Sequence, residues 1–209
     1  MKASARVRPS AGRRAAALAA AIVAVGLVAL SADTVLTKTE SDSLARKIQL
    51  ITDNGASGRS QARLTPVSER EVNAYLRFEL RDKIPAGIAE PSVSILGEGR
   101  VSATATVDLD AYKAQRKSTG WLDPTNLLMG KLPVAAEGVL QTAAGSGRFA
   151  LQSASISGVP VPKAVLQELV TYYSRSPQNP QGVNLDAPFE LPARILEIRV
   201  GQGSAVVVQ

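Results

Sequence analysis

Two aspartates near the middle of the chain have the spacing that carboxylate chemistry requires. Asp108 and Asp110 are separated by one residue at the end of an alternating segment, so on an extended strand both carboxylates point to the same face. Such a pair could act in general acid–base catalysis or hold a hard metal cation. Serines and threonines share this face, however, which is typical of a solvated strand end. We therefore expect no catalytic site, no metal site and no cofactor.

The chain contains neither histidine nor cysteine. This composition excludes thiol nucleophiles, the Ser–His and Cys–His arrangements and the usual zinc ligands. The sequence also lacks the G-x-S-x-G motif, the P-loop and the dinucleotide fingerprint. We predict that the protein is not an enzyme, and a hydrolase built on Asp108 and Asp110 is the alternative.

The basic residues of the chain are concentrated at its N-terminus. The net charge is +6, but five basic residues lie between Lys2 and Arg14, before the first acidic residue, Asp33. Without those five, the chain has 19 basic and 18 acidic residues. Because no basic patch is interleaved with aromatic residues, we predict no nucleic-acid partner.

An uncharged apolar segment follows the basic N-terminus. Residues 15–30 are apolar throughout, and Ala29 and Ser31 are small residues that could precede a cleavage site, as in a secretory signal peptide. Residues 15–32 are also just long enough for a single membrane anchor. We therefore predict that residues 1–32 are a signal peptide or an anchor. Either alternative places the domain outside the cytoplasm, in the periplasm or cell envelope.

After this segment we predict a spacer, 33–60, and one domain, 61–209. The first part of the spacer is polar, and residues 43–52 could form a short helix or a first strand. The domain begins around an amphipathic helix, Val67–Ile84. Ser68 and Glu71 have the spacing of a capping box, in which each side chain bonds a backbone N–H at the helix start. Apolar residues recur at helical spacing after them, so the helix needs a partner surface.

The rest of the domain is mainly a series of alternating segments. The clearest is Val101–Leu109, where aliphatic residues alternate with hydroxyl and acidic residues, and Gly97–Gly99 predicts the turn of its hairpin. A second predicted hairpin contains a phase slip near Gln152–Ser153, which indicates a β-bulge. A helix led by Pro162 and a last hairpin close the chain. This order predicts an α+β domain, in which a curved antiparallel sheet of about six strands wraps two helices, after an N-terminal hydrophobic helix.

The inner face of this predicted sheet is aliphatic and often small. Small residues either let a helix pack closely or leave an apolar groove. Burying about eight methylene groups of an acyl chain there would contribute about 6 kcal/mol before ordering costs. The predicted groove residues are Val72, Tyr75, Leu76, Leu80, Val101, Ala103, Ala105 and Val107.

The segment between the two hairpins, 111–131, breaks the alternation and carries an apolar cluster. It could contact a membrane surface or gate the groove, and the alternative is a flap that completes the core. The predicted membrane-contact residues are Trp121, Leu122, Leu127, Leu128 and Met129.

Three stretches carry a resemblance: SEREVNAYL at 68–76, ISGVPVPKAVLQELV at 156–170 and LPARILEIRVGQGSAVVV at 191–208. With the N-terminal signal or anchor, they resemble bacterial envelope proteins of the YpmS-like type and lipid-binding relatives in the tubular lipid-binding (TULIP) superfamily. In that superfamily a curved antiparallel sheet wraps a long helix and encloses an acyl chain. The resemblance implies a similar wrap and a lipid or glycolipid partner, and it transfers no catalytic residue.

The sequence thus predicts an extracytoplasmic lipid-binding or lipid-transfer domain at a membrane surface. The alternative is a non-catalytic scaffolding module whose partner is another envelope protein.

Overall fold

A computed structural model describes residues 35–57, 62–110, 130–177 and 179–209, of which 36–209 belong to one compact unit. The predicted signal peptide or anchor, 1–32, lies outside the described residues. The five predicted membrane-contact residues, Trp121, Leu122, Leu127, Leu128 and Met129, lie outside them too.

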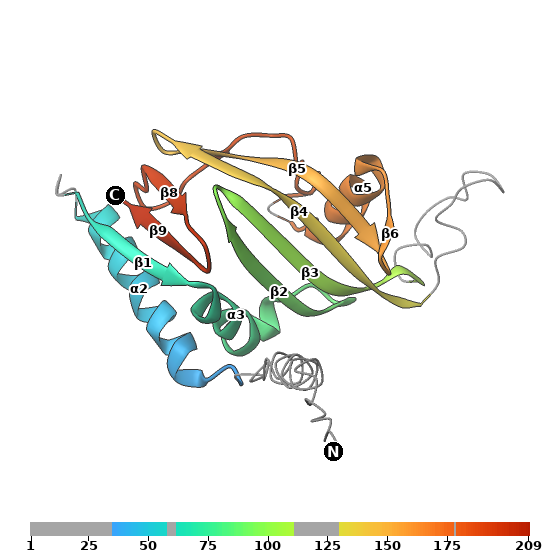
Figure 1. The fold of residues 1–209 in the computed structure, drawn as a ribbon, viewed down its shortest axis with the longest axis horizontal. Coiled ribbons are helices and arrows are strands. Elements are labelled where there is room, and N and C mark those ends of the chain that lie inside the picture. Colours follow the sequence, from blue (N-terminus) through green and yellow to red (C-terminus); the bar gives the residue numbers. More distant parts are fainter. Residues whose placement is uncertain (1–34, 58–61, 111–129, 178) are drawn as a thin grey trace, which may run out of the picture. The chain divides into compact units, whose positions relative to one another are not determined.

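Two antiparallel sheets form the framework of this unit (Figure 1). The larger sheet has the strand order β2-β3-β4-β5-β6, with β7 beside β5, and the smaller has the order β1-β9-β8. The predicted α+β class and six-stranded antiparallel sheet are confirmed. The strands are β1 (Leu64–Ser68), β2 (Ile88–Gly97), β3 (Arg100–Asp108), β4 (Lys131–Ala143), β5 (Ser146–Ile156), β6 (Val159–Pro160), β7 (Phe189–Glu190), β8 (Glu197–Val200) and β9 (Ser204–Val208).

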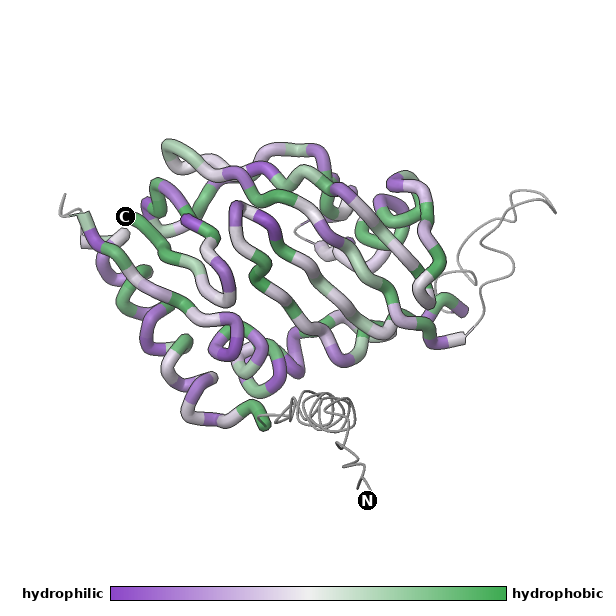
Figure 2. Tube along the Cα trace, in the orientation of Figure 1, coloured by the Kyte–Doolittle hydropathy of each residue, from purple (hydrophilic) through white to green (hydrophobic). Residues whose placement is uncertain are grey.

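The hairpins of the larger sheet follow the alternation of the sequence, which Figure 2 shows as hydrophobic and hydrophilic residues in turn along β3. β2 and β3 join at the predicted turn, where Glu98 and the glycines on either side of it have positive φ. In β4 and β5, Glu137 pairs with Ser153 and Gly138 with Leu151, so Gln152 has no partner in the ladder. The predicted β-bulge is therefore confirmed.

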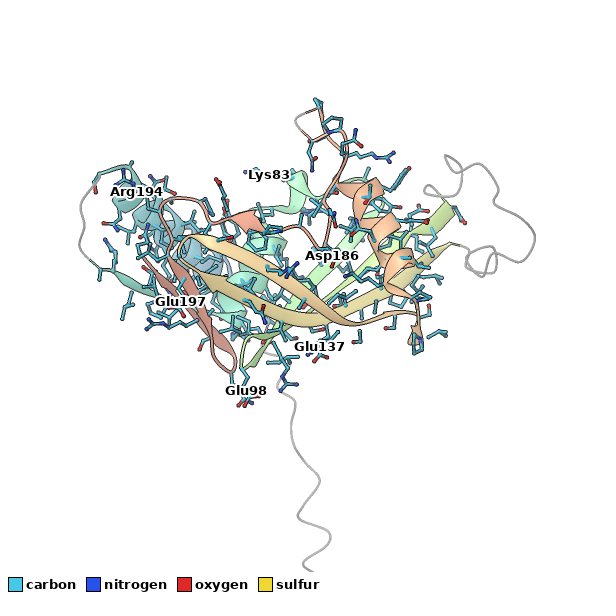
Figure 3. All side chains as sticks on the ribbon, turned by 90° about the horizontal axis from the view of Figure 1, so that it is seen from above. Lys83, Glu98, Glu137, Asp186, Arg194 and Glu197 are labelled. Atoms are coloured by element: carbon cyan, nitrogen blue, oxygen red, sulfur yellow. The ribbon has the colours of Figure 1, made fainter. Side chains whose placement is uncertain are left out.

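One helix covers the core of the larger sheet. α5 (Lys163–Ser174) begins after Pro162, as predicted, and buries Leu166 and Leu169. Figure 3 shows Glu137 on the side of this sheet opposite α5, as expected from the alternation along β4. The buried residues of this core are Val107, Leu109, Val134, Ala154, Ile156, Leu166 and Leu169.

Most of the predicted spacer at 33–60 is folded with the domain, because α2 (Lys38–Ala56) occupies it. Of the two alternatives for residues 43–52, the structure shows the helix, and this helix is longer than predicted. Thr37 and Glu40 form a capping box at its start. Ile51 of α2 forms a second core with Leu191 and Ile195 beside the smaller sheet. The sequence of this segment has a weak hydrophobic pattern, because two of the four residues on its buried face are small. The buried residues are Ser41, Leu44, Ile51 and Gly55.

The predicted helix at Val67–Ile84 begins correctly and ends early. Ser68 caps α3 (Glu69–Phe78) through the predicted capping box with Glu71. The chain then forms a short 3-10 helix, η2 (Arg81–Lys83). Ile84 is extended, because it precedes Pro85 and an α conformation there would clash with the proline ring.

Candidate functional site

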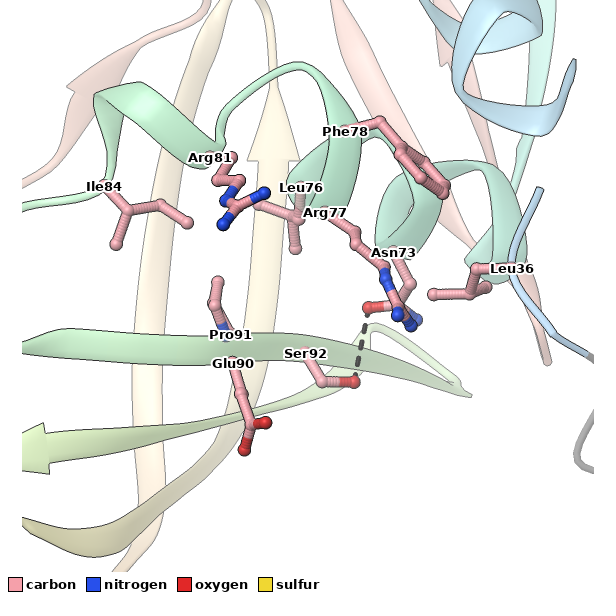
Figure 4. A pocket seen from close by; sticks show the side chains of 10 residues that line it. All are labelled: Leu36, Asn73, Leu76, Arg77, Phe78, Arg81, Ile84, Glu90, Pro91 and Ser92. Atoms are coloured by element: carbon pink, nitrogen blue, oxygen red, sulfur yellow. Dashed lines mark hydrogen bonds between the residues drawn. The ribbon is translucent and has the colours of Figure 1, made fainter. Parts of the chain in front are cut away.

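A cavity with a volume of about 740 Å³ lies between the α3–η2 segment and the edge strand β2 (Figure 4). Its wall combines five apolar side chains with two arginines, and a single carboxylate residue contributes to it. The lining residues are Leu36, Asn73, Leu76, Arg77, Phe78, Arg81, Ile84, Glu90, Pro91 and Ser92.

Side chains of α3 bond directly to the sheet edge beside the cavity. The Asn73 Nδ2 donates to the Val93 carbonyl at 2.8 Å, and the Val93 amide donates to Asn73 Oδ1 at 2.8 Å. The Ile95 amide donates to Glu69 Oε2 at 2.6 Å. These bonds take the place of a neighbouring strand and fix the start of α3 against β2.

The edge strand is irregular where it lines the cavity. The register of β2 and β3 shifts between Ala89 and Ser92, and Glu90 has a φ of 51°. Pro91 has no N–H to offer to a partner, and proline is typical of protected sheet edges. Figure 4 shows the Pro91 side chain facing Arg81 across the cavity.

The charges on the wall are unequal. Arg77 and Arg81 both line the cavity, and within the described ranges no ion pair joins either to a carboxylate. The Arg77 guanidinium carbon lies 6.0 Å from the centroid of the Phe78 ring. In Figure 4 the Glu90 carboxylate points away from both arginines. The cavity is therefore amphipathic, with a cationic side.

The structure places most of the predicted groove residues outside the lining of this cavity. Among the eight predicted groove residues, Leu76 lines the cavity, and Val72, Tyr75, Leu80, Val101, Ala103, Ala105 and Val107 do not. α5 covers the inner face of β3, where Val107 is buried in the core and Ala105 packs against it. Ala103 lies beyond that cover and is exposed. α3 instead packs on α2, β1 and β2.

The two aspartates that suggested carboxylate chemistry act as hydrogen-bond acceptors at the end of β3. The Asp110 amide donates to Asp108 Oδ1 at 3.1 Å, and the Gly130 amide donates to Asp110 Oδ1 at 2.9 Å. Neither aspartate lines the cavity. In the part of the chain that the structure describes, no group of three metal-ligating side chains comes together.

Sequence reasoning missed a buried polar cluster between α2 and α3. Glu71 accepts hydrogen bonds from Ser43 Oγ at 2.6 Å, from Lys47 Nζ at 2.7 Å and from the Ser68 amide at 2.9 Å. Burial of Glu71 opposes its ionisation, but these donors outweigh burial and lower its pKa to about 2. The cluster uses serine and lysine as donors to one carboxylate, so its role is to join the helices.

Comparison with family models, curated proteins and solved structures finds no significant match to this chain. The resemblance to envelope lipid-binding proteins therefore stays a prediction. Of the helices in the described ranges, none has the length and apolar composition needed to cross a membrane.

Proposed function

We propose that the protein is an extracytoplasmic, membrane-associated domain that binds or transfers a lipid in the cavity between α3–η2 and β2. The observation that carries this proposal is the amphipathic cavity itself. Its volume of about 740 Å³ falls within the range of roughly 300–1,000 Å³ that is usual for small-molecule sites. Its apolar side chains suit an acyl chain, because they would otherwise face water.

Lipid binding can be tested with the full-length protein extracted from membranes in mild detergent. Native mass spectrometry should show co-purifying lipid, and added palmitate should bind the delipidated protein. Leu76→Trp should weaken palmitate binding at least tenfold, because the larger ring fills the cavity. Val159→Trp is the matched control, since Val159 is 60% exposed on β6 and does not line the cavity.

Thermal melts should show that both variants fold. A protein that carries no lipid on gentle isolation and binds no palmitate would refute the proposal, and so would equal effects of the two substitutions.

The second candidate is the scaffolding module, and the edge strand β1 is the observation that bears on it. β1 lies at the edge of the smaller sheet, and Leu64 at its start is 60% exposed. An envelope protein could add a strand there. Pro66, in the middle of this short strand, lacks an N–H and makes strand addition less favourable. Cross-linking in intact cells that captures one partner through β1, without bound lipid, would favour this candidate.

A further inference from the structure

We infer that the cavity selects a single-chain amphiphile with an anionic headgroup, which Arg77 and Arg81 hold while the acyl chain lies against the apolar wall. This inference rests on the proposed function and specifies its ligand class.

The two arginines reach the cavity from consecutive elements. Arg77 lies in the last turn of α3, and Arg81 opens η2, so the interruption of the helix at Glu79 and Leu80 separates them. Both are exposed in the structure, yet both line the cavity. Figure 4 shows their guanidinium groups on the α3–η2 side, with Pro91 on the opposite wall.

The carboxylates near these arginines are engaged elsewhere or directed away. Glu79 forms an ion pair with Lys38, at the start of α2. Glu40 pairs with Arg70 instead. Asp82 is exposed on η2 and is not part of the cavity wall, and the Glu90 carboxylate points away from the arginines. The cavity therefore offers two guanidinium groups to an external anion.

The chemistry of the wall favours an anion that also carries a chain. A guanidinium group binds a carboxylate or phosphate through two parallel hydrogen bonds, which a neutral headgroup cannot match. The Phe78 ring lies beside Arg77, within cation–π distance of its guanidinium group. A small free anion gains the charge contact but buries none of the apolar wall, which consists of Leu36, Leu76, Phe78, Ile84 and Pro91.

The test compares ligands of equal chain length and different headgroup. Binding of palmitate and of hexadecanol to the delipidated full-length protein is measured at physiological ionic strength, with acetate as a competitor. We expect palmitate to bind at least tenfold more tightly than hexadecanol. Acetate at millimolar concentration should not displace palmitate.

The double variant R77Q/R81Q should reduce this preference to about twofold while leaving hexadecanol binding unchanged. R46Q/R148Q is the matched control, because both residues are exposed and lie away from the cavity, so it should keep the full preference. Equal binding of the two ligands by the unmodified protein, a preference that survives in R77Q/R81Q, or displacement by acetate would overturn the inference. Failure of both ligands to bind would instead refute the proposed lipid-binding function.

Discussion

Lys47 Nζ lies 2.7 and 2.8 Å from the two carboxylate oxygens of Glu71, so one lysine of α2 holds the capping residue of α3. Glu71 is only 9% exposed, and its carboxylate also accepts bonds from Ser43 and from the start of its own helix. The contact between the two helices therefore depends on the ionised form of this carboxylate.

Acid should weaken the fold through this carboxylate. The pKa of Glu71 is about 2 in the folded protein, against an ordinary value of 4.5. A carboxyl group with a lowered folded-state pKa stabilises the protein above its unfolded-state pKa, and that contribution is lost as the pH falls through the folded-state pKa. The urea midpoint should therefore fall as the pH decreases from about 5 to 2. A midpoint that does not change over this range would contradict the assignment.

Replacing the carboxylate should separate its role from the general effect of acid. Glu71→Gln leaves Lys47 without its charge partner and should lower the free energy of unfolding by about 2 kcal/mol. The melting temperature should fall by about 4–8 °C, and the dependence on acid should become weaker. Glu98→Gln is the control, because Glu98 is exposed at the tip of the β2–β3 hairpin and should change neither property.

Close packing at Gly55 should make a helix-favouring substitution destabilising. Alanine is preferred over glycine within a helix by about 1 kcal/mol, but a Cβ at Gly55 would lie 2.4 Å from the Ala193 carbonyl oxygen. Since that oxygen belongs to the backbone, it cannot move aside freely, and Gly55→Ala should lower the melting temperature. Gly201→Ala should be nearly neutral in the same thermal melts, because its new Cβ would meet no atom closer than 3.5 Å. If the two variants are equally stable, the contact between α2 and the backbone at Ala193 is less close than the structure shows.

Removing the amide of Asn73 should loosen α3 from the sheet edge. Asn73→Ala leaves the Val93 N–H and C=O without their side-chain partners and should cost about 1–3 kcal/mol. Hydrogen exchange at the Val93 amide should become faster. Gln49→Ala, which removes one exposed bond to Asp53, should leave that exchange rate unchanged. Protection of Val93 that persists in Asn73→Ala would mean that another group covers this edge.

The hydroxyl of Tyr173 should report on the packing of α5 against β3. It donates to the Asp108 carbonyl, and burial, together with Tyr172 and Asp108, raises the pKa of Tyr173 to about 12. Because the raised value favours the protonated folded state, stability should fall as the pH rises from about 10 to 12. Tyr173→Phe should lower the free energy of unfolding by about 1 kcal/mol. In an ultraviolet titration it should also remove the rise in tyrosinate absorbance near pH 12. Tyr75→Phe is the control and should retain this rise; if the rise disappears in Tyr75→Phe instead, the titration near pH 12 belongs to Tyr75.

Local patterns predicted the four long strands of the larger sheet, β2 to β5, and its helix. Alternation and positive-φ glycines define the hairpins because side chains point to opposite faces in turn and glycine adopts left-handed turns at little cost. The phase slip at Gln152 predicted the bulge for the same reason. The S-x-x-E spacing predicted the start of α3. Thr37 and Glu40 have the equivalent T-x-x-E spacing at the start of α2. The buried face of α2 contains small residues as well as aliphatic ones, so the helix is harder to recognise from its hydrophobic pattern.

Local spacing does not specify which face of a strand or helix is covered by another element. Val107 and Ala103 belong to one alternating face, yet α5 buries the first and leaves the second exposed. The cavity depends on bonds between Asn73 and Val93, twenty residues apart, and on an irregular edge at Glu90. Neighbouring residues specify the hairpins, the caps and the apolar character of the walls, because these features depend on local spacing. The position of the cavity and its cationic side arise from contacts between distant segments, which local spacing does not specify.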